Sequence, residues 1–384
     1  MRRKQLITLA LYSLGMYVMG NMAITLLPVY AVQRGMNESM VGIYFALAFS
    51  LTTIGAFVGG WLSNRFQRRK LTLIVVSVIG IPATYLMGQS HNLTTLTLFT
   101  LIDWFIVGIA VAVLNILVGM YAQPHERGRI FGMIATMIAL GQVIGAFVCG
   151  AVVQRWGFPA LYSLTALAWL APLIAALFIQ DDQRIIRPKG QPKPAAVPLG
   201  RAVSLMIVAT ILASISGNIA GLARPLTMNL LGFDANAISS AASVSGLVAL
   251  PLPFLVGWLS DRTGRRQVLL ASYIVTCLGM LVLIGALNLG QFWLSGSLMA
   301  LAGGAGGVAS ALLTDLAPAE AQGTALARFS ATPWIAAIIG FGATGVVIQT
   351  LGLAVTLLIG AALPLSAIAL LLWSTRRSLE VVPA

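Results

Sequence analysis

The sequence predicts an all-α polytopic membrane protein with twelve transmembrane helices in two pseudo-symmetric six-helix bundles. Three observations support this fold class. The 384 residues are 59% hydrophobic and only 9% charged, whereas soluble globular chains carry about 25% charged residues. Long apolar runs recur along the whole chain, and the second half repeats short motifs of the first. The composition excludes a water-soluble enzyme and a disordered protein.

Twelve apolar runs, each bounded by charged or turn residues, account for the predicted helices. A helix needs about 20 apolar residues to cross a bilayer. These runs are too long for the strands of a barrel, so every one is expected to be helical. The first six lie near residues 6–31, 40–63, 71–89, 95–121, 129–152 and 158–179. The second six lie near residues 203–231, 236–259, 268–288, 291–315, 325–349 and 354–374.

Positive charge is concentrated on one side of the predicted spans. The chain has 23 Lys and Arg against 10 Asp and Glu. Arg34 and Arg155 fall in outer loops, and Arg224 falls within a span. The other cations share the side of the N terminus: Arg2, Arg3, Lys4, Arg65, Arg68, Arg69, Lys70, Arg127, Arg129, Arg184, Arg187, Lys189, Lys193, Arg201, Arg262, Arg265, Arg266, Arg328, Arg376 and Arg377. The positive-inside rule therefore predicts a multi-pass protein of the cytoplasmic (inner) membrane with both termini cytoplasmic. This distribution explains the net charge without a nucleic-acid partner.

The chain divides into two similar halves. Residues 181–200 are polar and contain four prolines, which is typical of a flexible linker. We expect it to join bundles at 1–180 and 201–384. Gly20-Asn21 and Pro28 recur at an offset of 197 as Gly217-Asn218 and Pro225. Parallel repeats of this kind imply a pseudo-two-fold axis along the membrane normal, with a substrate path between the halves.

One loop motif occurs in both halves. The second copy has the pattern G-x-L-x-D-R-x-G-R-R over residues 257–266, and the first copy, at 60–69, has Asn64 in place of the acid and Gln67 in place of the second glycine. The residues of the two copies that carry the pattern are Gly60, Asn64, Arg65, Arg68, Arg69, Gly257, Asp261, Arg262, Gly264, Arg265 and Arg266. On these residues the chain resembles the major facilitator superfamily over essentially its whole length.

The resemblance implies a role for this motif in gating. In that superfamily the acid and the following arginines bind the helix end of the opposite half and lock the cytoplasmic gate. Asp261 can do this in the second copy, whereas the neutral Asn64 is expected to make the first lock weaker.

A second pattern resembles the 12-helix drug:proton antiporter group of the superfamily. Its helix-5 motif is matched by glycines at four positions, while Ala146 and Cys149 replace a proline and a glycine. The matching residues are Gly132, Gly141, Gly145 and Gly150. Small residues at this spacing let helices approach closely, so generic helix packing is the open alternative.

Two charges inside the predicted spans are candidates for the transport pathway. Asp103 and Arg224 lie at similar predicted depths on the fourth and seventh spans, which line the central cavity in the superfamily. We hypothesise that they form an ion pair between the halves, and that Asp103 takes up a proton when the pair opens. Two simpler interpretations stay open. Arg224 extends to the outer interface, or Asp103 only makes hydrogen bonds within the protein.

Polar and aromatic residues on the predicted cavity-lining helices complete the candidate set. Asn21 and Asn218 are favoured because both repeats place an amide at the same depth. The further candidates for the substrate and proton pathway are Tyr17, Trp104 and Asn115. Trp104 stands where many proton-coupled relatives have an arginine, which puts a direct transfer of their proton relay in doubt.

The sequence thus predicts an alternating-access secondary transporter and not an enzyme. We expect proton-coupled efflux of small amphipathic, drug-like molecules by a monomer in the lipid bilayer. The energy source is the proton gradient, and neither a cofactor nor a metal is expected. The alternatives are a sugar or metabolite exporter, a lysolipid flippase of the same fold, or a uniporter.

Overall fold

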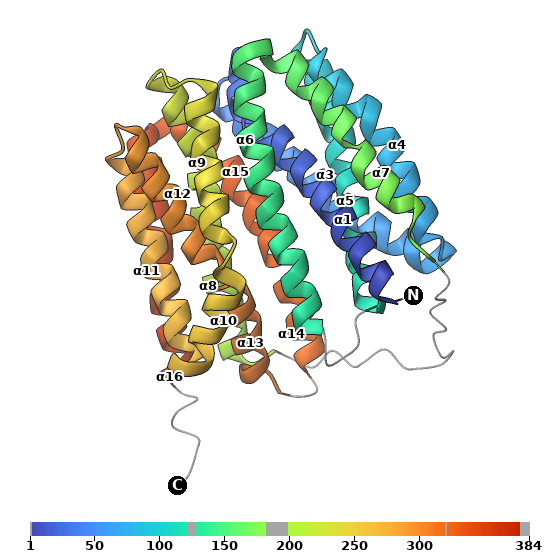
Figure 1. The fold of residues 1–384 in the computed structure, drawn as a ribbon. Coiled ribbons are helices and arrows are strands. Elements are labelled where there is room, and N and C mark those ends of the chain that lie inside the picture. The colour runs from blue at the N-terminus through green and yellow to red at the C-terminus, as the bar shows by residue number, and fades with distance from the viewer. Residues whose placement is uncertain (1, 122–126, 182–198, 319–320, 377–384) are drawn as a thin grey trace. The chain divides into compact units, whose positions relative to one another are not determined.

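Helices make up the regular secondary structure of the described residues, and no strand occurs among them. The computed structural model describes residues 2–121, 127–181, 199–318 and 321–376. The first helices along the chain (Figure 1) are α1 (Arg2–Ile24), α2 (Leu27–Gln33), α3 (Glu38–Phe66), α4 (Arg69–Gly88), α5 (Leu93–Tyr121), α6 (Arg127–Ala168) and α7 (Leu170–Leu177). The remaining helices are α8 (Arg201–Leu230), α9 (Ala235–Ala249), α10 (Leu252–Thr263), α11 (Arg265–Ile284), α12 (Leu289–Gly303), α13 (Gly306–Leu316), α14 (Gln322–Ser330), α15 (Thr332–Leu351) and α16 (Leu353–Arg376).

Some predictions fall on parts of the chain that the structure does not describe. Of the predicted linker, only Asp181, Leu199 and Gly200 belong to the described residues. The cations Arg184, Arg187, Lys189, Lys193 and Arg377 lie outside them. The same holds for the side chains of Arg2, Arg3, Arg127, Arg129 and Arg376.

Several predicted spans are built from two consecutive helices. The first span corresponds to α1 and α2, the eighth to α9 and α10, the tenth to α12 and α13, and the eleventh to α14 and α15. A proline stands at the first or second position of α2, α10 and α15. Proline lacks a backbone N–H, so it fits the first turn of a helix and interrupts a helix that would otherwise continue.

The helices have the length and composition of membrane spans. Ten of the described helical runs are long and apolar enough to cross a bilayer, or eleven if the bent pair α9–α10 counts as one span. One run, Gly132–Leu177, covers 46 residues. It contains non-helical backbone at Gly157, with φ 77° and ψ 179°. This break separates the predicted fifth and sixth spans, and the all-helical fold of the prediction is confirmed.

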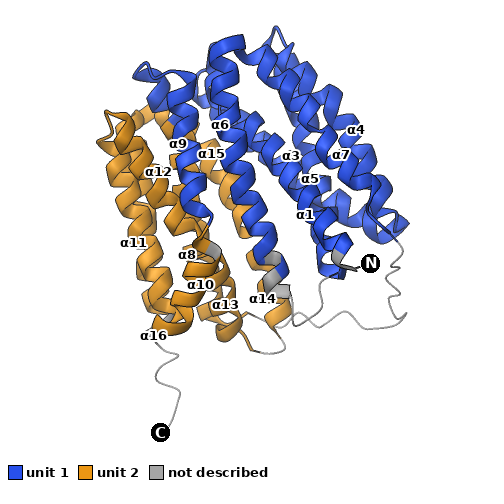
Figure 2. Cartoon of the chain, in the orientation of Figure 1, with its two compact units in different colours: residues 1–187, 225–250 blue, residues 188–224, 251–384 orange. Residues whose placement is uncertain are grey.

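The chain forms two compact units (Figure 2). Residues 1–187 and 225–250 belong to unit 1, and residues 188–224 and 251–384 belong to unit 2. Residues 225–250 join unit 1 because α9 packs along α6. The side-chain amide of Gln142 donates to the Ala242 carbonyl at 3.3 Å, and that of Gln154 donates to Asp234 at 3.2 Å. The predicted bundles at 1–180 and 201–384 stay a prediction.

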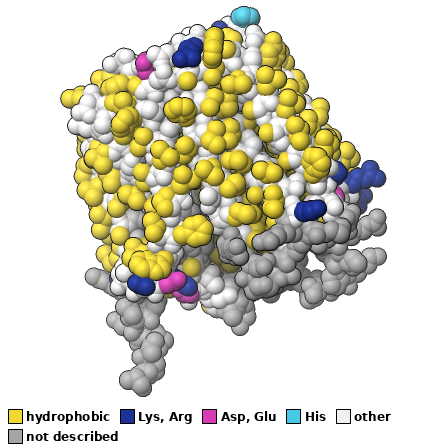
Figure 3. Space-filling model, viewed as in Figure 1, with side chains coloured by type: hydrophobic (Ala, Val, Ile, Leu, Met, Phe, Trp, Pro, Cys, Tyr) yellow, Lys and Arg dark blue, Asp and Glu magenta, His cyan; other side chains and the backbone are white. Residues whose placement is uncertain are grey.

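Each unit has its own apolar core. The core of unit 1 surrounds Tyr12 and Trp169, which are both fully buried. The core of unit 2 surrounds Leu313 and Leu371. Many large apolar side chains are exposed instead, and hydrophobic side chains are spread over the whole described face in Figure 3. Such a surface suits a lipid environment, because hydrocarbon chains solvate apolar side chains as well as a protein core does.

Helices α3 and α5 cross at van der Waals contact of their backbones. A Cβ atom added to Gly55 would lie 2.1 Å from the Phe105 carbonyl oxygen, and one added to Gly108 would lie 2.1 Å from the Thr52 carbonyl oxygen. The contact is therefore reciprocal, with a glycine of each helix facing the backbone of the other. Small residues permit this approach, which is a common mode of helix association in membranes.

In both copies of the loop motif, the preceding helix ends at a residue with positive φ, but the residue type differs. Gln67 ends α3 in the left-handed region, with φ 54°. Gly264 ends α10 with φ 95° and ψ 140°. Residues with a side chain rarely adopt positive φ, whereas glycine adopts it readily.

The α3–α5 crossing makes Gly108→Ala destabilising. The added methyl group cannot fit against the Thr52 backbone, so the substitution should cost about 2 kcal/mol or more of stability. Thermal unfolding of the purified protein measures the loss. Gly119→Ala on the same helix is the control, because a Cβ there meets nothing within 4 Å. Equal melting temperatures for the two variants would contradict the close crossing.

Backbone conformation makes Gly264→Ala destabilising as well. Forcing alanine into this positive-φ region should cost about 1 kcal/mol or more. Gly285 ends α11 with φ −95° and has open space around it, so Gly285→Ala should leave the melting temperature almost unchanged. A melting temperature for Gly264→Ala as high as that of Gly285→Ala would show that the loop tolerates a side chain.

Candidate functional site

Asp103 is a buried acid on α5 with partners in its own unit. Its side chain is 2% exposed. The Thr84 hydroxyl on α4 donates to Oδ1 of Asp103 at 2.7 Å, and Nε1 of Trp169 donates to the Thr84 hydroxyl at 2.9 Å. The indole N–H can only donate, so the single hydroxyl proton of Thr84 is directed at the carboxyl group. The chain Trp169–Thr84–Asp103 therefore has a fixed direction.

Close packing holds Trp169 in this position. The Trp169 side chain is fully buried at the start of α7. A Cβ atom added to Gly80 on α4 would lie 2.4 Å from the indole ring, so the ring lies directly on the α4 backbone. Gly80, Thr84 and Trp169 were not candidates from the sequence. No local pattern in the sequence connects Thr84 to a tryptophan 85 residues later. The weak signal that could have identified Thr84 is that it is a hydroxyl residue on the span next to that of Asp103.

A pair of buried hydroxyl groups lies one turn before Asp103, between α3 and α5. The Tyr44 hydroxyl of α3 is hydrogen-bonded to that of Thr100, which is three residues before Asp103 and donates to the Leu96 carbonyl at 2.8 Å. Residues three apart on a helix share one face. Buried polar side chains from α3, α4, α5 and α7 thus gather around one stretch of α5.

Tyr30 of α2 binds the next turn of α4. The Tyr30 hydroxyl donates to the carbonyl groups of Met87 and Gly88, each at 3.3 Å. It accepts a hydrogen bond of 3.0 Å from the Arg34 guanidinium. Met87 and Gly88 are three and four residues after Thr84, so Tyr30 and Asp103 bind successive turns of α4.

Arg224 is a charged residue in the interior of α8. Its side chain is partly exposed, and no hydrogen bond or ion pair joins it to another described residue of unit 2. Arg224 and Asp103 belong to different units, so their ion pair stays a prediction. What the structure adds is that Asp103 is hydrogen-bonded within unit 1.

The two repeated asparagines have the same surroundings in the two units. Nδ2 of Asn21 donates to the Tyr17 carbonyl at 2.8 Å, and Nδ2 of Asn218 donates to the Ser214 carbonyl at 2.9 Å. A Cβ atom added to Gly145 would lie 2.9 Å from Cβ of Asn21, and one added to Gly340 would lie 2.8 Å from Cβ of Asn218. Each asparagine thus marks a close contact between the first and fifth spans of its repeat.

The other predicted pathway residues are separated by the fold. Trp104 is 9% exposed and packs edge-on against the rings of Phe45 and Phe49, with centroids 6.0 and 4.7 Å away. Tyr17 is partly buried on α1, and Asn115 is exposed on α5. Trp104 therefore belongs to an aromatic cluster between α3 and α5.

The helix-5 glycines serve two different contacts. Cβ atoms added to Gly141 and Gly145 would lie 2.6 Å from Cβ of Tyr17 and 2.5 Å from the Val18 carbonyl oxygen, both on α1. At Gly150 an added Cβ would overlap the Ser239 hydroxyl on α9. Gly132 has open space around it. Small residues thus allow α6 to pack closely against α1 near Gly141 and Gly145, and against α9 near Gly150.

The first copy of the loop motif is anchored inside unit 1. Arg69 is fully buried; its Nε donates to the Ser63 hydroxyl at 2.8 Å, and its Nη1 lies 3.4 Å from Oδ1 of Asp181. The Lys70 backbone N–H donates to the same carboxylate at 3.2 Å. Arg69 therefore joins the start of α4 to the segment after α7. Asn64, Arg65 and Arg68 are exposed, and Gly60 has open space around it.

The second copy makes a different set of contacts in unit 2. Arg265 pairs with Asp315 near the end of α13 and donates to the Ala311 carbonyl at 3.1 Å. The Arg262 guanidinium lies over the Trp258 ring, 4.0 Å from its centroid. Asp261 is exposed, Arg266 is partly buried, and Gly257 has open space around it. Contacts of either copy with the opposite half stay a prediction.

The described residues contain no group of three His, Cys, Asp or Glu side chains that could hold a metal ion. A carboxyl group such as that of Asp103 is chemically able to carry a proton, and a guanidinium group such as that of Arg224 can attract an anion.

Comparisons with known proteins place the whole chain in one family. The model of the Major Facilitator Superfamily matches residues 9–205 and 206–383. The multidrug resistance protein MdtG of Klebsiella pneumoniae is 23% identical over 283 residues, which is 69% of this chain and 68% of that protein. The probable nitrate/nitrite transporter NarK2 of Mycobacterium tuberculosis is 26% identical over 263 residues, or 65% of this chain and 64% of that protein.

Solved structures show the same fold. The POT family transporter PepTSo matches with a TM-score of 0.79 at 10% identity, covering 99% of both chains. At this identity the match concerns the fold alone. Because the family model covers both halves of the sequence, the chain belongs to the Major Facilitator Superfamily.

Proposed function

We propose that this transporter exports small amphipathic molecules in exchange for protons, with Asp103 as the proton carrier. The observation that carries the proposal is the buried carboxyl group of Asp103, held by Thr84 and Trp169. An ionisable side chain within a span costs about 2.5–3.5 kcal/mol even on lenient insertion scales, and such residues mark ion and proton pathways.

The surroundings of Asp103 suit reversible protonation. The carboxyl group accepts its hydrogen bond from a neutral hydroxyl of unit 1, and no described cation of that unit pairs with it. A neutral donor can hydrogen-bond to both the acid and the carboxylate. Within unit 1 the proton can therefore leave or return without the loss of a buried salt bridge, which is costly to break.

The export of drug-like molecules rests on the relatives. MdtG, at 23% identity, is named a multidrug resistance protein. The helix-5 glycines that resemble the antiporter motif pack α6 against α1 and α9. We further propose that both termini face the cytoplasm and that the protein works as a monomer in the cytoplasmic membrane, driven by the proton gradient without a cofactor.

Uptake or exchange of a small anion is the second candidate. Arg224 is a partly exposed cation in a span without an ionic partner in its own unit, as far as the described residues go. One relative is named a probable nitrate/nitrite transporter. Under this candidate Arg224 binds the anion, and Asp103 has a structural role.

Proton movement in energised everted vesicles separates the two candidates. A pH-quenched dye is followed while lipophilic cations, sugars, lysolipids and nitrate are added in turn. Dequenching by one class of amphipathic compound is expected, and Asp103→Asn should abolish it because an amide cannot carry the proton. Asp234→Asn is the matched acid-to-amide control, since asparagine caps α9 as well as aspartate does. A response that survives in Asp103→Asn removes Asp103 from the proton path.

The hydrogen-bond chain makes Thr84 and Trp169 positioning residues for that proton. Thr84→Val removes the donor to Asp103 and should lower substrate-driven proton flux about fivefold to tenfold, while Thr84→Ser restores the hydroxyl and most of the flux. Trp169→Phe should have an intermediate effect. The number of protons moved per substrate distinguishes positioning from packing. A ratio unchanged by Thr84→Val would assign Thr84 a packing role only.

A further inference from the structure

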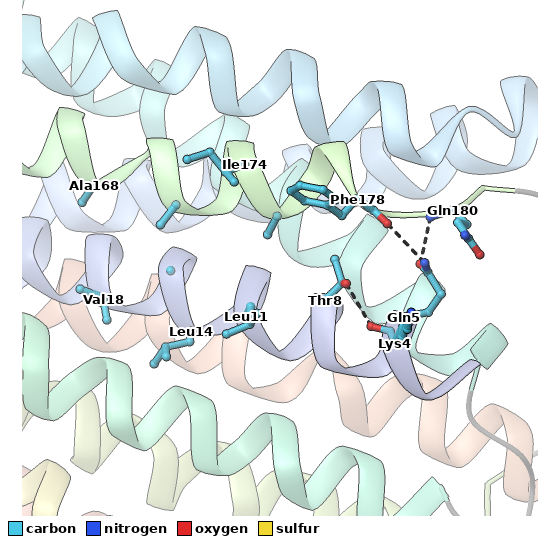
Figure 4. Close-up of a pocket in the computed structure, with 13 residues that line it drawn as sticks. Lys4, Gln5, Thr8, Leu11, Leu14, Val18, Ala168, Ile174, Phe178 and Gln180 are labelled. Carbon is cyan, nitrogen blue, oxygen red and sulfur yellow. Dashed lines mark hydrogen bonds between the residues drawn. The ribbon is translucent and has the colours of Figure 1, made fainter. Parts of the chain in front are cut away.

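A long groove runs between α1 and α7 on the surface of unit 1. Its volume is about 900 Å³. Most of its lining is apolar, and Figure 4 shows these side chains in a row from Ala168 and Val18 to Phe178. Leu11, Ile174 and Phe178 are 55%, 55% and 68% exposed. The groove is thus open, mostly apolar and formed by two helices.

Two contacts join the walls of the groove. About one turn before the end that Val18 lines, the helices touch, because a Cβ atom added to Gly15 would lie 2.9 Å from the Pro172 side chain. At the other end Gln5 bridges to the segment after α7. Its Nε2 donates to the Phe178 carbonyl at 3.3 Å, and its Oε1 accepts from the Gln180 backbone N–H at 2.9 Å (Figure 4). The groove extends past the Gly15 contact to Val18 and Ala168.

The polar end of the groove carries a positive charge. The Thr8 hydroxyl donates to the Lys4 carbonyl at 3.0 Å, and the Gln5 amide is used in the bridge. Lys4 is the charged residue of the lining and is exposed. Its ammonium group has no ion pair within the described part of the chain. An anion is the complementary partner.

The length of the groove matches one leaflet. Ten residues separate Thr8 from Val18, which is about 15 Å along a helix at 1.5 Å per residue. Half of a hydrocarbon core about 30 Å thick is also about 15 Å. A lipid chain in the groove would therefore place its head group beside Lys4.

We infer that this groove is a binding site for an anionic phospholipid of the leaflet on the N-terminal side. One acyl chain lies between α1 and α7, and the phosphate contacts the Lys4 ammonium. A basic residue at the membrane surface favours an anionic lipid by about fivefold. A groove without a charged residue would show no such preference.

Native mass spectrometry of the purified, delipidated protein tests this site. Phosphatidylglycerol and phosphatidylcholine with identical acyl chains are added separately, and the bound lipids are counted. The wild-type protein should retain one phosphatidylglycerol with about fivefold preference. Lys4→Gln should abolish the preference, and Ala171→Trp, at an exposed position of the lining, should block the groove and remove the bound lipid.

Arg328→Gln is the matched control, because Arg328 is an exposed cation of α14 outside the groove. It should leave the preference unchanged. Equal retention of the two lipids by the wild-type protein would overturn the inference. So would a loss of preference in Arg328→Gln as large as that in Lys4→Gln, since the effect would then depend on total charge and not on the groove.

Discussion

The crossing of α3 and α5 is the contact on which the buried acid depends. Gly55 and Gly108 each bring the backbone of one helix against that of the other. Asp103 precedes Gly108 by five residues, which is a rotation of about 140° around the helix from the glycine that faces α3. With α5 held at this distance and rotation, Asp103 meets Thr84 of α4. A displacement of α5 would leave a buried carboxyl group without its donor, at a cost of several kcal/mol.

The internal repeat conserves helix contacts more strictly than charges. Asn21 with Gly145, and Asn218 with Gly340, form the same close contact in each unit. The loop motif, in contrast, has diverged. Arg69 binds Ser63 and Asp181 in the first copy, while Arg265 binds Asp315 in the second. Packing of backbones tolerates few replacements. An exposed ion pair such as Arg265–Asp315 contributes little and can be exchanged for another partner.

Much of the fold follows from the sequence, because apolar length and the repeat act locally. The break between the fifth and sixth spans is an example: it lies at Gly157, within the gap left between 129–152 and 158–179. The burial of Asp103 was also predictable, since it is an acid in an apolar run. Its partners were not. Thr84 and Trp169 are brought to Asp103 by the packing of three helices, and Trp169 fits only because Gly80 lacks a side chain.

Other candidates were separated by the same packing. Trp104 follows Asp103 directly, yet it belongs to the cluster of Phe45 and Phe49 because adjacent helix positions face in different directions. Sequence spacing could not decide which of the two faced another span.

Infrared difference spectroscopy of the purified protein in lipid, recorded between acidic and alkaline pH, tests the central claim most directly. We expect a protonated carboxyl C=O band that is absent in Asp103→Asn and moves to higher frequency in Thr84→Val, where the hydrogen bond to the carboxyl group is lost. Spectra that are identical for the wild-type protein and Asp103→Asn across this pH range would contradict it.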